Sequence, residues 1–375
     1  MEDKKWRRMS PAPASTEVTP VKRPGNWPAP TAKRSHRMEW SPVKAVTKRN
    51  GHAERVQTYI FMDFETTGLF KEKVPENRDN LKNPDDFYHE LNQLIMMTND
   101  STYPRITEMS FLAVSREDFL EAATAMRDSD TKSIQRLANS VHTRQLNPKL
   151  DTKSWEEYET SRFRDGGKYL VHARAMLERK NSFNVEWPAV LEFFRNCTKP
   201  AVLVAHNGLS YDMRVLYGEL KRYEMVESFK IPDDIFFVDT MHMVRNIETS
   251  SAEQLTTIVK SIDWEKLQKE FHGTTTAVKD FHPMDYLDQS TWSVAKRRRI
   301  KRDNFRKSTT NKWVYMHDSF VRGTTKQETI FTNIFETTYT AHYAQDDAEA
   351  LQQICLAFGT DFVDYVDHKC ATIPY

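Results

Sequence analysis

The chain has 375 residues and a formal net charge of +1, with 39% hydrophobic and 29% charged residues. This size and composition suit one large soluble domain with extensions and leave room for two domains at most. No apolar run approaches the ~20 residues of a membrane helix, and the three cysteines fit neither a zinc-binding spacing nor a disulfide framework.

Residues 1–55 form a basic, proline-rich segment. They hold 13 Lys/Arg against 5 Asp/Glu, a net charge of +8, so the other 320 residues sum to −7. With seven of the sixteen prolines and few large aliphatic residues, the segment cannot bury enough apolar surface to offset the entropy of ordering it. We predict a disordered tail whose charge suits nucleic acid, an import receptor or simple solvation. Because it starts without an apolar leader, we expect an intracellular protein in the nucleus, the cytoplasm or both.

Five apolar runs predict the strands of a buried sheet. In chain order they are Tyr59–Met62, Arg105–Ser115, Val141–Leu146, Ala201–Ala205 and Ile235–Val238. Helical patterns are expected at 86–97, 169–179, 186–196, 210–223 and 341–358. Three strands followed by strands that alternate with helices predict an α/β fold with a mixed sheet covered by helices.

Asp63 and Glu65 follow the first apolar run, in the stretch DFETTG at 63–68. Side chains alternate along a strand, so two carboxylates two residues apart project from the same face. Carboxylates suit Mg²⁺ or Mn²⁺, and a shared cation relieves their repulsion. Taken alone, such a pair is more often an exposed acidic strand end. The buried run before it, and a turn after it in which Gly68 tolerates positive φ, favour a metal site that a nucleotide can approach.

The strand Ala201–Ala205 leads into His206 and Asn207, and Asp212 follows six residues after the histidine. Ligands of α/β sheets gather at the carboxyl ends of strands, so Asp212 is a candidate for completing the metal site. Alternatively, Asp212 is a solvent-exposed acid on the helix with no role in a site. His206 and Asn207 fit turn capping as well as catalysis, and Tyr211 fits a contact at the substrate end.

His342 and Asp347 lie five residues apart near the start of the last predicted helix. A regular helix would separate their side chains by ~140°. We therefore expect His342 at or before the first turn and Asp347 on the inward face. Histidine titrates near neutral pH and suits proton abstraction from water. Asp346 competes with Asp347 for the ligand role, and the spacing favours Asp347.

The four carboxylates together fit a site for two divalent cations. Cations ~3.5–4 Å apart clamp the attacking and leaving oxygens when a phosphodiester is hydrolysed. The candidate ligands are Asp63, Glu65, Asp212 and Asp347. His342 would then accept the proton of the attacking water.

These stretches resemble the three motifs of the DEDDh exonucleases, which carry Asp-x-Glu, His-Asn…Asp and His-x4-Asp. FMDFETTGL, PRITEMSFLAV, LVAHNGLSYD, FFVDT and AHYAQDDAEAL occur in the order seen in the animal three-prime repair exonucleases. The resemblance covers about 57–242 and 341–358. It implies a ribonuclease H-like fold with a mixed five-stranded sheet and two Mg²⁺ ions per site, replaceable by Mn²⁺. It also implies 3′→5′ release of nucleoside monophosphates from single-stranded DNA or DNA 3′ ends, in DNA repair or degradation.

Residue by residue, the resemblance implies metal-binding carboxylates at Asp63, Glu65, Asp212 and Asp347, and a general base at His342. The candidate contacts to the terminal nucleotide are Glu65, Thr66, Asn207, Tyr211 and His342. Many relatives are homodimers joined along a sheet edge, which here is the strand Val141–Leu146. The implied boundaries are 56–360 for the exonuclease domain, with a basic insertion at about 245–340, and 361–375 for a C-terminal extension.

Two features depart from the family. Its Ile-Thr-Gly-Leu-type loop before the second motif has no counterpart in 151–183, so the preference for single or double strands stays open. Residues 245–340 are longer than in compact members and contain KRRRIKRDNFRK at 296–307. This run suits a phosphate backbone or an import receptor, and a solvated loop less. The candidate nucleic-acid contacts are Arg297, Arg298, Arg299, Lys301 and Arg302, with Phe305 and Trp313 nearby for stacking or for core packing.

Two other functions fit the same residues. An exoribonuclease would use the same site and differ by recognising the 2′-OH. A non-catalytic nucleic-acid-binding scaffold would keep the fold, but the presence of all five expected site residues argues against it.

Overall fold

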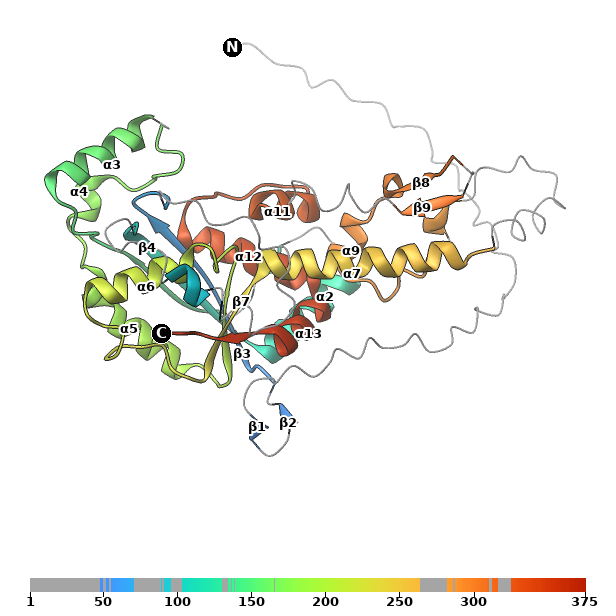
Figure 1. Cartoon of the computed structure of the whole chain (residues 1–375), viewed down its shortest axis with the longest axis horizontal. Helices are drawn as coiled ribbons and strands as arrows, with labels where there is room; N and C mark the ends of the chain where they lie inside the picture. The colour runs from blue at the N-terminus through green and yellow to red at the C-terminus, as the bar shows by residue number, and fades with distance from the viewer. Residues whose placement is uncertain are drawn as a thin grey trace, which may run out of the picture. The chain divides into compact units, whose positions relative to one another are not determined.

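The computed structural model in Figure 1 describes the folded part of the chain and short pieces elsewhere. The described residues are 48–49, 52–53, 55–70, 89, 91–95, 103–129, 134–135, 137, 139–164, 166–263, 282–285, 287–309, 312–315 and 325–375. The predicted tail 1–55 lies outside them, apart from Arg55 and the paired strands β1 (Lys48–Arg49) and β2 (His52–Ala53). Within the described residues, no helix has the length and apolar character that a membrane crossing requires.

A mixed sheet of six strands, in the order β10-β7-β6-β3-β4-β5, organises the fold. The strands are β3 (Thr58–Thr66), β4 (Ile106–Ser115), β5 (Ser140–Gln145), β6 (Ala201–Ala205), β7 (Ile235–Asp239) and β10 (Ala371–Thr372). β3, β4 and β5 are antiparallel, whereas β3, β6 and β7 run parallel. The predicted α/β class and the five predicted strands are confirmed. The strand count is corrected to six, because the two-residue β10 is too short to carry a sequence pattern.

Helices cover both faces of this sheet (Figure 1). One face packs against α2 (Arg116–Ser129), α7 (Thr240–Ser261), α11 (Gln327–Phe335), α12 (Ala344–Phe358) and α13 (Thr360–Lys369). The other packs against α5 (Phe183–Asn196) and α6 (Asp212–Arg222). Alternation along β3 sends Tyr59 and Phe61 to the α12 face and Ile60 and Met62 to the α5 face.

Several helices differ from the sequence prediction. The helix expected at 169–179 shrinks to α4 (Arg174–Leu177), and α3 (Thr152–Arg164) forms in a stretch with no predicted element. α3 buries only Trp155 and Tyr158. Two residues make too narrow an apolar stripe to give the helical periodicity by which a helix is predicted. The helix α7 was also not predicted, because Thr, Ser and Asn residues interrupt its apolar face. Of the helix expected at 86–97, residues 89 and 91–95 are helical and the rest lie outside the described residues.

The expected C-terminal extension, 361–375, completes the domain instead. Phe362 and Val366 of α13 are fully buried in the core of the α12 face, and β10 pairs antiparallel with β7. The basic insertion begins inside α7 and continues through α9 (Val294–Arg299), β8 (Phe305–Lys307) and β9 (Trp313–Tyr315). The C-terminal half of α7, β8 and β9 form a small separate core with Trp292 and Ile300, in which Phe305 is buried and Trp313 packs at the edge. Val294 and Ala295 of α9 belong instead to the core of the α12 face.

Candidate active site

Strand β3 presents Asp63 and Glu65 on the α12 face, continuing the alternation of Tyr59 and Phe61. β3 pairs with β6 only as far as Phe61, because β6 ends at Ala205, whereas its pairing with β4 continues to Thr66. The two carboxylates therefore lie beyond the end of β6. This is the position that the rule for carboxyl ends of strands predicts for a site.

Three carboxylates meet there. Asp63, Glu65 and Asp347 each offer one ligand atom, and these atoms lie within 4.8 Å of one another. Asp347 comes from α12, whose Ala348, Leu351 and Cys355 are buried against the sheet. The structure thus brings Asp347 rather than Asp346 into this group, which is the arrangement that the spacing favours.

Asp212 lies beside the group, at the first position of α6, and is only 3% exposed. Among the described residues, none donates a hydrogen bond to its buried Oδ1. An unsatisfied buried carboxylate oxygen is costly, and a cation is the partner that suits it. This orphan oxygen and the three grouped carboxylates are the donor set of a hard divalent cation, so the residues present fit such a metal.

The pKa values of these acids are raised because the site is poorly hydrated and, to a smaller extent, because it is crowded with negative charge. Loss of hydration is the largest cause for each, followed for Asp63 and Glu65 by the charge of Asp347. The pKa of Glu65 rises to about 8 and that of Asp212 to about 7. Like charges in low dielectric oppose joint ionisation, and a bound cation reverses that effect.

We expect the metal-free protein to lose stability as the pH rises from about 4.5 to about 8. Folded-state pKa values above the unfolded ones mean that the native state binds more protons in this window. Unfolding then becomes easier as the pH increases. Thermal unfolding with a chelator should show a Tm several degrees lower at pH 8 than at pH 5. Mg²⁺ or Mn²⁺ should restore it, mostly at the higher pH.

The matched variants for this experiment are Glu65→Gln and Glu192→Gln, the latter an exposed acid on α5. Glu65→Gln should raise the metal-free Tm at pH 8 and weaken the response to metal, whereas Glu192→Gln should change neither. A metal-free Tm that increases between pH 5 and pH 8 would contradict the assigned charge crowding.

Hydrogen bonds hold Asp347 in place. Tyr339 Oη donates to its Oδ1 at 2.7 Å, and the His342 backbone N–H donates to its Oδ2 at 2.7 Å. Gln327 Nε2 donates to the Asp347 carbonyl at 2.8 Å. Tyr339 and Gln327 carry no sequence signal, because the contacts depend on how α11 and the following loop fold over α12.

His342 lies just before α12, as predicted from its five-residue spacing to Asp347. Its φ is 71°, in the left-handed region that non-glycine residues seldom adopt, and such strain persists where surrounding contacts enforce it. The contacts are its N–H bond to Asp347 and an edge-on packing against Tyr169, with ring centroids 4.9 Å apart. Among the described residues, none forms a hydrogen bond with either imidazole nitrogen of His342.

The loop between β6 and α6 is shaped by Asp239, the N-cap of α7. Its carboxylate accepts hydrogen bonds from the backbone N–H groups of Asn207 and Leu209, each at 3.0 Å. Asn207 has a φ of 59°, and a Cβ on Gly208 would lie 2.5 Å from that of Ala205. The turn that leads to Asp212 thus requires the Asn-Gly pair.

His206 and Tyr211 fasten neighbouring segments. The ring nitrogens of His206 lie 2.9 Å from Thr240 Oγ1 and 2.6 Å from the Thr325 carbonyl. These contacts fit the turn-capping role that the sequence left open for His206 as the alternative to catalysis. The Tyr211 hydroxyl lies 2.5 Å from Thr66 Oγ1 and donates to the Gly68 carbonyl at 2.6 Å. Tyr211 therefore fixes the turn after Glu65. Contacts of Thr66, Tyr211 and Asn207 with a nucleotide stay predictions.

A fifth acid, Glu108 on β4, was missed by the sequence reasoning. It is the cross-strand partner of Glu65, is 5% exposed, and adds to the raised pKa of both Asp63 and Glu65. Its Oε2 accepts a hydrogen bond from the Ala344 N–H at 2.9 Å and lies 3.2 Å from His172 Nε2. An acid inside an otherwise apolar strand is the signal that could have found it.

The five basic candidates of the insertion separate by environment. Arg299 is buried and ion-paired with Glu248, and Arg298 donates to the Ile334 carbonyl at 2.6 Å. Arg297 donates to the Arg127 carbonyl at 2.8 Å. Lys301 and Arg302 are exposed, with Arg302 paired to Asp285 at 2.6 Å. The structure thus places Arg299 where a nucleic acid cannot reach it and leaves Lys301 and Arg302 at the surface.

Replacing Arg299 is expected to destabilise the fold rather than to weaken nucleic-acid binding. Arg299→Leu leaves Glu248 buried without its partner, a loss of about 3–5 kcal/mol. Denaturant unfolding should show this loss, and adding Glu248→Leu should recover most of it, because two apolar groups can replace a buried pair. Lys301→Gln should stay within about 0.5 kcal/mol of the parent. An unchanged unfolding free energy for Arg299→Leu alone would contradict a structural role.

Comparisons with known proteins yield distant structural likenesses. No protein-family model matches the chain, and no curated protein matches it. Product-bound exonuclease I is 11% identical, with a TM-score of 0.37 over 83% of this chain and 46% of that one. The zinc-bound E. coli ExoI–ssDNA complex is 9% identical, with a TM-score of 0.40 over 83% and 43%. Cell-death related nuclease 4 (CRN-4) is 9% identical, with a TM-score of 0.32 over 84% and 67%.

The chain therefore spans less than half the length of these two exonuclease I chains. At these identities and TM-scores the likeness carries no weight for substrate or mechanism, which rest on the site residues. The resemblance to the three-prime repair exonucleases therefore stays a prediction from the sequence motifs.

Proposed function

We propose that this protein is a metal-dependent 3′→5′ exonuclease of the DEDDh type that releases nucleoside monophosphates from DNA ends. The observation that supports it most is the meeting of Asp63, Glu65 and Asp347, whose ligand atoms lie within 4.8 Å of one another. Within the described part of the chain, no lysine or arginine forms an ion pair with these three acids, and only His342 acts on one of them, lowering the pKa of Asp347 against the effect of burial. Such crowding without a counter-ion is the arrangement expected where a metal supplies the positive charge.

In the proposed reaction, different residues bind the metal, accept the proton and contact the nucleotide. Asp63, Glu65, Asp347 and Asp212 would hold the metal. Divalent cations bound there would activate the attacking water and stabilise the leaving 3′ oxygen. His342, held before α12 by Asp347 and Tyr169, would accept the proton of that water. The Glu65–Gly68 turn, fixed by Tyr211, would contact the terminal nucleotide.

The test is a cleavage assay on a 5′-labelled single strand with Mg²⁺ or Mn²⁺. A ladder of products shortened one nucleotide at a time is expected, whereas a circular strand should stay intact because it has no 3′ end. The same sequence as RNA shows whether the 2′-OH is tolerated. No cleavage of either linear strand by folded, metal-loaded protein would overturn the proposal in favour of the binding scaffold.

The finer expectations belong to the same proposal. Mg²⁺ as the resident metal, kinship with the three-prime repair exonucleases, a role in DNA repair or degradation, and an intracellular location rest on the sequence resemblance and composition. A homodimer along β5 would use the free edge of the sheet, where Val141 is 47% exposed. Analytical ultracentrifugation of the parent and of Val141→Lys tests that edge directly.

A further inference from the structure

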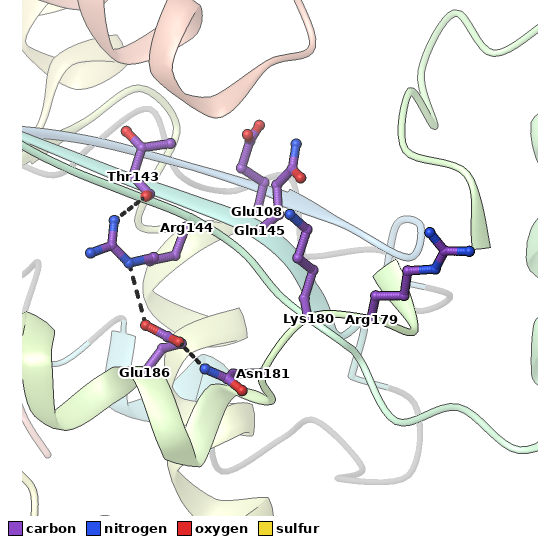
Figure 2. A pocket seen from close by; sticks show the side chains of 8 residues that line it. All are labelled: Glu108, Thr143, Arg144, Gln145, Arg179, Lys180, Asn181 and Glu186. Atoms are coloured by element: carbon purple, nitrogen blue, oxygen red, sulfur yellow. Dashed lines mark hydrogen bonds and ion pairs between the residues drawn. The ribbon is translucent and has the colours of Figure 1, made fainter. Parts of the chain in front are cut away.

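A cavity of about 420 Å³ lies between β4, β5 and the loop that joins α4 to α5. Its lining residues are Glu108, Thr143, Arg144, Gln145, Arg179, Lys180, Asn181 and Glu186. The volume is in the range of pockets that hold small ligands. Figure 2 shows Lys180 extended toward the side formed by Gln145 and Glu108, while Arg144 turns toward Glu186.

The acids that line this cavity already have partners. Glu186 pairs with Arg144 at 3.4 Å and accepts a hydrogen bond from Asn181 at 2.6 Å. Glu108 is held by the Ala344 N–H and by His172. Arg179 and Lys180 are exposed, and within the described residues neither forms an ion pair. Arg179 and Lys180 therefore give the cavity unpaired positive charge, which suits the binding of an anion.

The cavity and the candidate metal site share a wall, because Glu108 lines the cavity and is the cross-strand partner of Glu65. A strand whose 3′-terminal linkage lies at the metal site carries all its other phosphates on the 5′ side of the bond to be cut. We propose that Arg179 and Lys180 bind one of these phosphates and so set the register of the strand. This inference rests on the proposed exonuclease function and identifies the ligand as a backbone phosphate of the substrate strand.

The first measurement compares Arg179→Gln/Lys180→Gln with the matched pair Arg195→Gln/Lys230→Gln, which removes two exposed cations elsewhere. On a ten-nucleotide strand, the cavity variant should raise KM about tenfold and leave kcat within twofold. Its binding should depend less on salt, with a slope lower by about 0.7 for one lost phosphate contact on a single strand. The matched pair should leave KM and the salt slope unchanged.

The second measurement uses strands in which one phosphate at a time is a neutral methylphosphonate. The parent protein should show a raised KM at one position upstream of the scissile bond, and the cavity variant should be insensitive at that position. Equal sensitivity of parent and variant at every position would overturn the proposal. A variant that weakens inhibition by a free nucleoside monophosphate as much as it raises KM would also overturn it, because the cavity would then hold product.

These outcomes separate the two proposals. If the parent protein cleaves no strand, the exonuclease function fails. If it cleaves with a KM that the cavity variant does not change, the exonuclease function stands and the phosphate site fails.

Discussion

Asp63→Asn is expected to lower kcat by about 10³-fold or more, because it removes a ligand oxygen charge where the transition state needs positive charge held in place. Its carboxylate lies within 4.8 Å of those of Glu65 and Asp347, and its pKa is raised well above the usual value by loss of hydration and by Asp347. Single-turnover cleavage of a labelled strand at saturating Mn²⁺ measures the effect.

A structural explanation for such a loss would be excluded by unfolding data. Asp63→Asn should raise the metal-free Tm at pH 8, because it relieves repulsion, and should reduce the metal-induced increase in Tm. The neighbouring pair Asp347→Asn and Asp346→Asn is the matched control on α12. Asp347→Asn should resemble Asp63→Asn, while Asp346→Asn should keep kcat within about threefold. Equal losses for Asp346 and Asp347 would show that the wrong acid has been placed in the site.

His342→Asn is expected to lower kcat by about 10²–10⁴-fold, the usual contribution of a general base. Asparagine tolerates the left-handed backbone conformation at this position, where φ is 71°, so the turn before α12 should survive. Metal affinity, measured by calorimetry with Mn²⁺, should change little, because the backbone N–H that supports Asp347 remains.

The pH profile distinguishes a base from a positioning residue. The His342→Asn variant should gain activity steadily as the pH rises, because hydroxide replaces the missing acceptor. His368→Asn, at an exposed histidine on α13, should behave like the parent. A variant at His342 with kcat within tenfold of the parent would assign the proton transfer to another group.

The five-residue spacing of His342 and Asp347 predicted where these residues lie but not which residues hold them there. The five-residue interval predicted a histidine before the helix and an inward aspartate, and the structure has that arrangement. Asp347 accepts hydrogen bonds from Tyr339 and Gln327, and His342 packs edge-on against Tyr169, so the residues that hold the pair lie on other segments. No local pattern could indicate them, because they depend on which segments pack over α12.

The sequence by itself determined the five longer strands of the sheet and the positions of Asp63 and Glu65 on β3. Apolar runs and two-residue alternation are local, so Asp63 and Glu65 could be assigned to one face before any packing was known. The short strand β10 and the helices α3, α7 and α13 were not predicted from the sequence, because their apolar periods are brief or interrupted.

Only the tertiary structure decided which charges share a site. Cross-strand register brought Glu108 opposite Glu65, and packing of α12 brought Asp347 to Asp63. Packing also buried Arg299 against Glu248, although the basic run had presented it as one of several equivalent cations. Charge and spacing are properties of the chain, whereas hydration and the distance between charges are set by the fold. The raised pKa values, the candidate metal site and the proposed phosphate-binding cavity depend on this hydration and these distances.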